Sequence, residues 1–228
     1  MSTARGSLAD VLRPVKHVLL DFDGPVCSVF AGFPASEVAR RLREGLLAVG
    51  EHTPPGAEDE TDPLALLRLI ADARPDLAKV TDGALAEMET EAVLVGRPNA
   101  GGESVLRACA RSRRTVSVVS NNARVAIETY LTDHGLSDYV SGVFGRTLGD
   151  PSSMKPNPRL LLGAMEAAKS RPEDCVFIGD ATRDVEAGDA AGVLTIGYAN
   201  KPGKEARLTA AGAVVVVSSM QAIADALL

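Results

Sequence analysis

Two acidic residues follow the first apolar run of the sequence, and their spacing suits both acid–base chemistry and metal binding. Val18–Leu20 is expected to be a short buried strand, and Asp21 and Asp23 come directly after it, before a turn at Gly24. Two carboxylates this close repel each other unless a cation lies between them, and such oxygen ligands suit Mg²⁺. An isolated Asp-x-Asp-Gly can equally begin an ordinary polar loop, so the rest of the chain must decide between the two.

Two later apolar runs, also expected to be strands, end in polar residues. One is followed by Ser120 and Asn121, and the other by Asp180. In open parallel sheets, ligands bind outside the carboxyl ends of the strands, so these side chains are candidates for one shared site. Turns favour Asp, Asn and Ser for their own reasons, which is the alternative explanation. Lys155, which should begin the next helix at the same edge, would supply the positive charge that an anionic substrate needs.

The segments that must position these residues alternate between strand and helix patterns. Such alternation predicts an α/β fold, with a parallel sheet covered by helices on both faces. The expected strands are 18–20, 115–119, 139–144, 175–178, 194–198 and 213–217; the expected helices lie at 103–111, at 123–134, from Pro156 or Pro158 onward, around 185–190, and after the last strand.

The segment between the first two motifs has a different pattern. From about residue 34 to 94 it shows helical spacing without strand-like alternation, and Ser36, Asp62 and Thr81 are the expected N-caps of three helices. This predicts a small helical insert in the α/β core. The expected boundaries are 1–30 and 102–228 for the core, 31–101 for the insert, and flexible joints at about 31–33 and 96–102.

Composition excludes several classes of function. The chain has 228 residues and a formal net charge of −6, which argues against binding a nucleic-acid backbone through bulk charge. Three cysteines without CxxC spacing suggest neither a disulfide framework nor a zinc site. No apolar run has the length of a signal peptide or a membrane span, so we expect a cytoplasmic protein without a membrane partner. The oligomeric state stays open.

Taken in order, the motifs resemble those of the haloacid dehalogenase-like hydrolase superfamily. Asp21-x-Asp23-Gly24 looks like the nucleophile motif of that family, and the other matches are Ser120-Asn121, Lys155-Pro156 and Gly179-Asp180-x-x-x-Asp184. The resemblance covers most of the chain and is greatest to phosphoglycolate phosphatase and β-phosphoglucomutase-like proteins. It implies a Rossmann-like catalytic core, with the insert as a mobile helical cap. Ala181 stands where many relatives have Ser or Thr.

The resemblance also implies roles for the acidic residues. Asp21 would attack phosphorus and form an aspartyl-phosphate, while Asp23 would protonate the leaving alcohol and later deprotonate water. Asp21, Asp180 and the backbone carbonyl of Asp23 would hold Mg²⁺, which would neutralise charge on the phosphoryl oxygens.

The remaining motif residues would bind phosphate or support the others. Ser120 and backbone amides near Asn121 would hold the phosphoryl oxygens, and Lys155 would screen the nucleophile from the incoming anion. Gly24 supports the turn after the nucleophile. Asp184 is expected either to lie beside the metal ligands or to orient Lys155; an ordinary acid at a helix start is the alternative.

The resemblance leaves three functions to compare. An acid at position 23 is the pattern of phosphatases and phosphomutases, so we expect a magnesium-dependent phosphatase acting on a small phosphorylated metabolite. A phosphomutase would need a second anion site from the cap, where Arg40, Arg41 and Arg43 look like a solvated helix face. A phosphate-binding module without catalysis is the third alternative.

Overall fold

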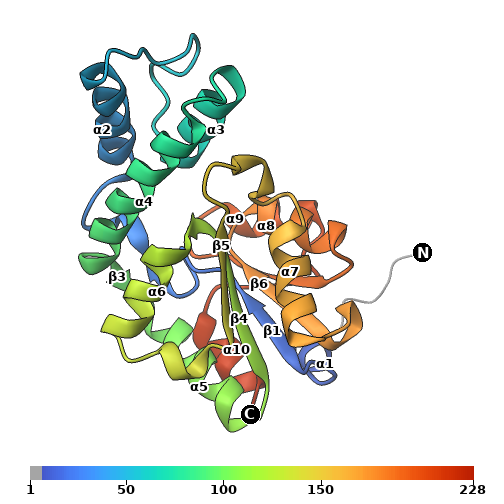
Figure 1. Ribbon diagram of the computed structural model, residues 1–228. Coiled ribbons are helices and arrows are strands. Elements are labelled where there is room, and N and C mark those ends of the chain that lie inside the picture. Colours follow the sequence, from blue (N-terminus) through green and yellow to red (C-terminus); the bar gives the residue numbers. More distant parts are fainter. Residues whose placement is uncertain (1–6) are drawn as a thin grey trace.

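A parallel six-stranded sheet forms the centre of the molecule (Figure 1). The computed structural model of the chain describes residues 7–228. In spatial order the strands are β5 (Gly142–Arg146), β4 (Thr115–Ala123), β1 (His17–Leu20), β6 (Cys175–Gly179), β7 (Leu194–Tyr198) and β8 (Val215–Val217). Because β1 lies between β4 and β6, the carboxyl ends of these three strands are neighbours.

Alternating side chains of β1 pack into apolar clusters on opposite faces of the sheet. Val18 and Leu20 belong to the larger cluster, and Leu19 belongs to the other. This period of two matches the side-chain alternation of a strand buried on both faces, and the α/β prediction is confirmed. The larger cluster includes residues of α1 (Leu8–Leu12), α5 (Ala100–Arg111), α6 (Arg124–Asp133) and α10 (Met220–Ala226); α7 (Arg159–Ala168) and α8 (Thr182–Ala190) contribute to the other, and α9 (Lys204–Ala211) packs beside β7 and β8.

Three helices follow the first motif: α2 (Ala35–Ala48), α3 (Pro63–Ala73) and α4 (Ala78–Leu94). They share an apolar cluster of their own, which Met154 joins from outside the helices. Figure 1 shows α2 and α3 above the sheet, with α4 running from them down to α6. Ala92 and Val93, at the end of α4, belong to the main cluster instead. The last turn of α4 is therefore part of the core packing.

The expected N-caps of these helices were correct for one helix and wrong for two. The Asp62 carboxylate accepts a hydrogen bond from the Leu64 N–H at 2.9 Å, and Pro63 is the first helical residue. Ser36 and Thr81 lie inside α2 and α4, whose caps are Pro34 and Leu77. Thr81 is buried, so packing extends α4 back by one turn and overrides the local capping preference.

Ordered secondary structure fills the expected joint at 96–102. β3 (Arg97–Pro98) pairs antiparallel with β2 (Cys27–Ser28), and α5 already begins at Ala100. A Cβ atom on Gly102 would lie 2.1 Å from the Pro25 carbonyl oxygen. That glycine therefore permits a close backbone approach, and it is not evidence of a flexible linker.

Other boundaries move by a few residues. β4 continues to Ala123 and does not end at Val119, so Ser120 and Asn121 lie on the strand itself. The register between β4 and β5 changes between Val119 and Ala123. The sequence pattern predicted that the strand ends at this irregular stretch. β5 and β8 begin later than expected, and α7 begins after Pro158, with Lys155 before it and not at its start. Among the described residues, no helix combines the length and apolar character that crossing a membrane requires.

Candidate active site

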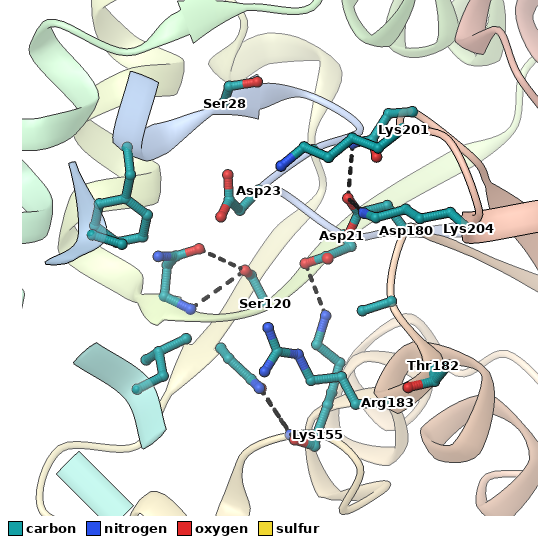
Figure 2. Close-up of a pocket in the computed structure, with 18 of the residues that line it drawn as sticks. Asp21, Asp23, Ser28, Ser120, Lys155, Asp180, Thr182, Arg183, Lys201 and Lys204 are labelled. Atoms are coloured by element: carbon teal, nitrogen blue, oxygen red, sulfur yellow. Dashed lines mark hydrogen bonds and ion pairs between the residues drawn. The ribbon is translucent and has the colours of Figure 1, made fainter. Parts of the chain in front are cut away.

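The predicted residues meet at one cavity beside the carboxyl ends of β1, β4 and β6 (Figure 2). Its volume is about 620 Å³. Leu64 of α3 and Ala35 of α2 line its wall as well, so the helical insert contributes to the cavity. Of the predicted residues, Asp21, Asp23, Gly24, Ser120, Asn121, Lys155 and Asp180 line it, and Asp184 lies buried behind Lys155.

Lys155 is buried between two carboxylates. Its Nζ atom lies 2.8 Å from Asp21 Oδ1 and 2.7 Å from Asp184 Oδ1. Burial alone would lower the pKa of Lys155, but the charges of Asp184 and Asp21 outweigh it and hold the pKa above its usual value. Lys155 is therefore a fixed positive charge directly behind the Asp21 carboxylate.

Asn121 holds the backbone of Lys155. Its side-chain oxygen accepts the Lys155 N–H at 2.7 Å, and its side-chain nitrogen donates to the Lys155 carbonyl at 3.1 Å. Arg68 of α3 donates to the same carbonyl at 2.7 Å. Both polar atoms of the Asn121 side chain thus bond to Lys155. Only the backbone N–H of Asn121 is then available to a phosphate.

Asp184 makes contacts that fit two of the roles considered for it. Its Oδ2 atom accepts the backbone N–H groups of Asp180 and Ala181 at 3.0 and 2.9 Å, as an acid at a helix start does. Its Oδ1 atom forms the ion pair with Lys155. Asp184 therefore fixes both the loop that carries Asp180 and the direction of the Lys155 side chain.

Three carboxylates are close enough to share a cation. Asp21, Asp180 and Asp184 each offer an oxygen atom, and these atoms lie within 4.8 Å of one another. An all-oxygen donor set of this kind fits Mg²⁺. The Asp23 carboxylate instead accepts the Val29 N–H at 3.0 Å, and Gly24 turns the chain at φ +107°. A Cβ atom at Gly24 would lie 2.5 Å from Asp180, so only glycine fits beside the acidic group.

The environment shifts the pKa of both acids at the end of β1 upward. Burial is the main cause for Asp21; the charges of Asp184 and Asp180 add to it, and Lys155 opposes it. Burial also raises the pKa of Asp23 to about 6, with Asp180 contributing and the Val29 hydrogen bond opposing. A carboxyl group with such a pKa exchanges protons near neutral pH, as a general acid–base requires.

Ser120 reaches the cavity from β4. Its hydroxyl donates to Asn122 Oδ1 at 3.1 Å and accepts the Asn122 N–H at 3.3 Å. These two bonds hold the Oγ atom on the cavity side of the strand, where Figure 2 shows it next to Asp21.

Comparison with known sequences identifies the family. The sequence model described as haloacid dehalogenase-like hydrolase matches residues 79–198. The chain belongs to this family.

Two curated phosphoglycolate phosphatases are similar to this chain in sequence. Phosphoglycolate phosphatase 1 of Pseudomonas aeruginosa is 28% identical over 202 residues, which cover 84% of this chain and 65% of that protein. Phosphoglycolate phosphatase of Xylella fastidiosa is 33% identical over 132 residues, which cover 55% of this chain and 56% of that protein. The matches therefore span less than two thirds of these two relatives. The expected likeness to phosphoglycolate phosphatases is confirmed, and the likeness to a β-phosphoglucomutase-like structure, at 17% identity, concerns the fold.

Solved structures confirm the fold. A predicted phosphatase from Clostridium acetobutylicum superposes with a TM-score of 0.69 at 17% identity, covering 92% of this chain and 97% of that one. CbbY from Rhodobacter sphaeroides, solved with phosphate, gives 0.65 at 16% identity, covering 92% and 99%. At such identities the likeness concerns the fold, and the Rossmann-like core is confirmed.

The loop after β7 and the start of α9 supply site residues that the family motifs do not include. Lys204 Nζ lies 2.5 Å from Asp180 Oδ2, and the Asn200 side chain donates to the same oxygen at 2.8 Å. Lys201 and, from α9, Arg207 also line the cavity. The rule that located Asp21 and Asp180, polar residues after a strand, would have found Asn200 and Lys201 after Tyr198.

A second buried cluster was missed altogether. Arg146 of β5 lies 2.7 Å from Asp82 and 3.1 Å from Glu89, both on α4. Glu89 also accepts the Asn122 side chain at 3.1 Å and the Ala123 N–H at 2.8 Å. These contacts join α4 to the end of β4. No sequence signal indicates them, because the partners are 57 and 64 residues apart.

Proposed function

We propose that the protein is a magnesium-dependent phosphatase that hydrolyses a small phosphorylated metabolite through an aspartyl-phosphate intermediate. The observation that carries this proposal is that one oxygen of the Asp21 carboxylate is held in place and the other is free to react. Its Oδ1 atom is held by the Phe22 N–H and by Lys155 Nζ, both at 2.8 Å. The other oxygen, Oδ2, accepts no hydrogen bond from the described residues, and Asp21 lines the cavity. Family membership and the phosphatase relatives support the same chemistry.

In the first half of the reaction, Asp21 Oδ2 attacks phosphorus. A bond forms between that oxygen and phosphorus while the bond from phosphorus to the substrate oxygen breaks. Asp23, two residues along the chain, gives its proton to the departing oxygen, so the alcohol leaves neutral. A pKa of about 6 for Asp23 means that a sizeable fraction is protonated just below neutral pH.

In the second half, water replaces the alcohol. The Asp23 carboxylate takes a proton from water, the water oxygen attacks phosphorus, and the bond from phosphorus to Asp21 breaks. Inorganic phosphate leaves, and both acids return to their starting states. Placing two opposite proton transfers on Asp23 explains why an acid–base group lies beside the nucleophile.

Charge on the phosphoryl group needs compensation at each step. Mg²⁺ held by Asp21, Asp180 and the Asp23 carbonyl, with Asp184 adjacent, would neutralise charge on the phosphoryl oxygens. Lys155 offsets the negative charge of the nucleophile, and the Ser120 hydroxyl would donate to a phosphoryl oxygen once it turns away from Asn122 Oδ1. Asn121 and Asp184 keep Lys155 in place through its backbone and its ammonium group.

We also propose that residues 31–101 act as a cap over a core of 1–30 and 102–228. Ala35 and Leu64 bring apolar surface to the cavity wall. Such a wall lowers the amount of water around the reacting groups, which strengthens the electrostatic interactions there.

Phosphate release from a substrate panel tests the proposal. The panel holds phosphoglycolate, pyrophosphate, sugar phosphates, nucleotides and an aryl phosphate, each with Mg²⁺ and with excess chelator. We expect release from at least one compound, and only with Mg²⁺; Ca²⁺ should substitute poorly, because it prefers looser coordination. Release that persists after exhaustive chelation would contradict the metal assignment. Silence across the panel would favour a phosphate-binding module.

A phosphomutase is the second candidate, and the cations on the cavity wall favour it. The sequence argument against a mutase was the lack of an anion site in the insert, but Arg183, Lys201 and Arg207 reach the cavity from the core. Given β-glucose 1-phosphate and a trace of the bisphosphate, we expect inorganic phosphate or no reaction. Rapid isomer formation without phosphate release would replace the hydrolase assignment.

A further inference from the structure

Lys204 contacts a carboxylate of the proposed metal site. Its Nζ atom lies 2.5 Å from Asp180 Oδ2. Figure 2 shows the Lys204 ammonium group beside Asp180, and both residues line the cavity. Asp180 is one of the three acids that can share a cation. A positive side chain is therefore in contact with a residue that is expected to bind Mg²⁺.

The position of Lys204 in its helix does not account for this contact. Lys204 is the first residue of α9, and Gly203 before it provides no side-chain cap. A cation at a helix N-terminus is unfavourable, because the N–H groups there carry partial positive charge. The Lys204 side chain instead reaches an acid 24 residues earlier in the chain. The attraction of Asp180 thus explains the contact, and helix stability does not.

The contact reduces the negative charge that a metal ion would meet. The carboxylates of Asp21, Asp180 and Asp184 carry three negative charges when they are ionised. Lys155 lies between the first and the last of them and offsets one charge. Lys204 offsets a second, so the cluster presents one negative charge to a divalent cation where it could present two. Like charges also repel, and a lysine at Asp180 therefore raises the free energy of Mg²⁺ in the site.

Asn200 makes a neutral contact with the same oxygen atom. Its side-chain nitrogen donates to Asp180 Oδ2 at 2.8 Å. Its side-chain oxygen is buried and has no hydrogen-bond partner among residues 7–228. Asn200 therefore orients the Asp180 carboxylate without changing the charge of the site, which makes it a matched contrast to Lys204.

The two lysines of the site differ in how firmly their surroundings hold them. Lys155 pairs with two carboxylates, and its side chain is 2% exposed. Lys204 is 17% exposed, and Asp180 is its one carboxylate partner in the part of the chain that the structure describes. A long, partly exposed lysine side chain can carry its ammonium group into water by rotating about its own bonds. Lys204 can therefore give way to a metal ion, whereas Lys155 stays in place.

We propose that Lys204 competes with Mg²⁺ for Asp180 and so sets the metal affinity of the site. The inference rests on the proposed magnesium-dependent function, because it needs a metal ion at Asp180. Lys204 balances the Asp180 charge when free Mg²⁺ is scarce, and it is displaced as free Mg²⁺ rises. A site of lowered affinity fills and empties as the free Mg²⁺ concentration changes. Phosphatase activity would then follow that concentration.

Calorimetric titration with Mg²⁺, without substrate, tests this proposal. K204M keeps the length of the side chain and removes its charge. We expect K204M to bind Mg²⁺ at least about tenfold more tightly than the wild type, because a unit charge acts strongly on an ion held by the same carboxylate. N200A removes the neutral donor instead, so it should bind Mg²⁺ about three- to tenfold more weakly, the range for one hydrogen bond.

The control for cavity charge in general is R207Q. Arg207 is an exposed residue of α9 that lines the cavity and forms no ion pair with any residue in the range 7–228. Solvent and salt screen such a charge, so R207Q should change the Mg²⁺ affinity less than about threefold.

Thermal unfolding gives a second readout that needs no turnover. In excess chelator, K204M should unfold at a lower temperature than the wild type, because Asp180 loses its positive partner. Mg²⁺ should then raise the unfolding temperature of K204M by more than it raises that of the wild type, since tighter binding to the folded state stabilises it more.

The outcomes separate this proposal from the metal assignment. Equal Mg²⁺ affinities of the wild type and K204M would overturn the proposal and leave the magnesium site standing. Weaker binding by K204M, in the same direction as N200A, would also overturn it, because Lys204 would then hold Asp180 in place for the metal. No Mg²⁺ binding by any of the four proteins would reject the magnesium site and the proposal together.

Discussion

Two buried ion-pair clusters of the same size, both within residues 7–228, differ in their surroundings. In one, Arg146 lies between Asp82 and Glu89, and the three side chains are 0%, 2% and 0% exposed. In the other, Lys155 lies between Asp21 and Asp184, with exposures of 2%, 9% and 1%. The one side chain that clearly reaches solvent is Asp21, the proposed nucleophile. Both clusters therefore bury charged groups, but only the cluster with Asp21 can be reached from the cavity.

The hydrogen bonds explain why one cluster is structural and the other has an oxygen atom that can react. The Arg146 guanidinium donates to Asp82, to Glu89 and to the Asn121 carbonyl, and Glu89 accepts further bonds from Asn122 and Ala123. A planar guanidinium suits such a closed set of donors and acceptors. Asp21 instead keeps one oxygen without a donor and has a raised pKa. The closed cluster joins α4 to β4, whereas the open one retains an oxygen that can react.

The largest expected effect comes from breaking the closed cluster. Arg146→Met should lower the free energy of unfolding by about 3–5 kcal/mol, because it leaves two carboxylates buried without a cation. Urea denaturation measures the loss. The matched control replaces Arg146, Asp82 and Glu89 together with apolar residues, which should recover most of the stability. A loss below about 1 kcal/mol would show that water or a rearrangement of the protein stabilises the two carboxylates that Arg146 leaves behind.

Removing the cation of the open cluster should lower activity as well as stability, because it too leaves buried carboxylates without a cation. Lys155→Met takes away the charge behind Asp21, and we expect kcat to fall by about 10²–10³-fold, the usual cost of one such electrostatic contact. Steady-state phosphate release checks this. A variant that keeps more than about a third of the wild-type kcat would mean that Lys155 is structural, like Arg146.

The raised pKa values predict how pH should affect stability. A folded-state carboxyl pKa above the unfolded value means that the folded protein binds more protons in between, so stability falls as pH rises through that window. For Asp23 the window runs from 3.8 to about 6. In chelator, the wild type should therefore lose stability relative to Asp23→Asn between these values. A constant difference between the two proteins from pH 4 to pH 7, measured by urea denaturation, would contradict the assigned shift.

An exposed ion pair should give the smallest effect. Arg159 lies 3.0 Å from Asp150, with side chains 65% and 36% exposed. Arg159→Gln should cost about 0.5 kcal/mol or less, since solvent screens such pairs. A loss of stability comparable to that of Arg146→Met would mean that burial does not determine how much an ion pair contributes.

The sequence indicated that the residues around the open cluster would lie at one edge of the sheet, but it gave no sign of the closed cluster. Asp21, Ser120 and Asp180 each follow or end an apolar run, and parallel strands bring such ends together without further information. Arg146 and its partners lie on different elements, and none of them follows a local pattern. Their meeting depends on how α4 packs against the sheet, which is a tertiary property.

Local patterns also failed where packing competed with them. Thr81 has the chemistry of an N-cap, yet it is buried inside α4. Gly96 and Gly102 suggested a flexible joint, yet a Cβ atom on either would clash, at 2.9 Å from Cys27 and 2.1 Å from Pro25. In both places the residue type reflects tight packing, whereas the local sequence pattern suggested a helix cap or a flexible joint.

Phosphate release by Asp21→Asn tests the central claim most directly. The substitution keeps the size of the side chain and removes the nucleophilic oxygen, so we expect turnover of the best panel substrate to fall below detection. The urea midpoint should stay at or above the wild-type value, because a neutral amide costs less to bury than a carboxylate. A folded Asp21→Asn protein that hydrolyses the substrate at a near-normal rate would contradict the aspartyl-phosphate mechanism.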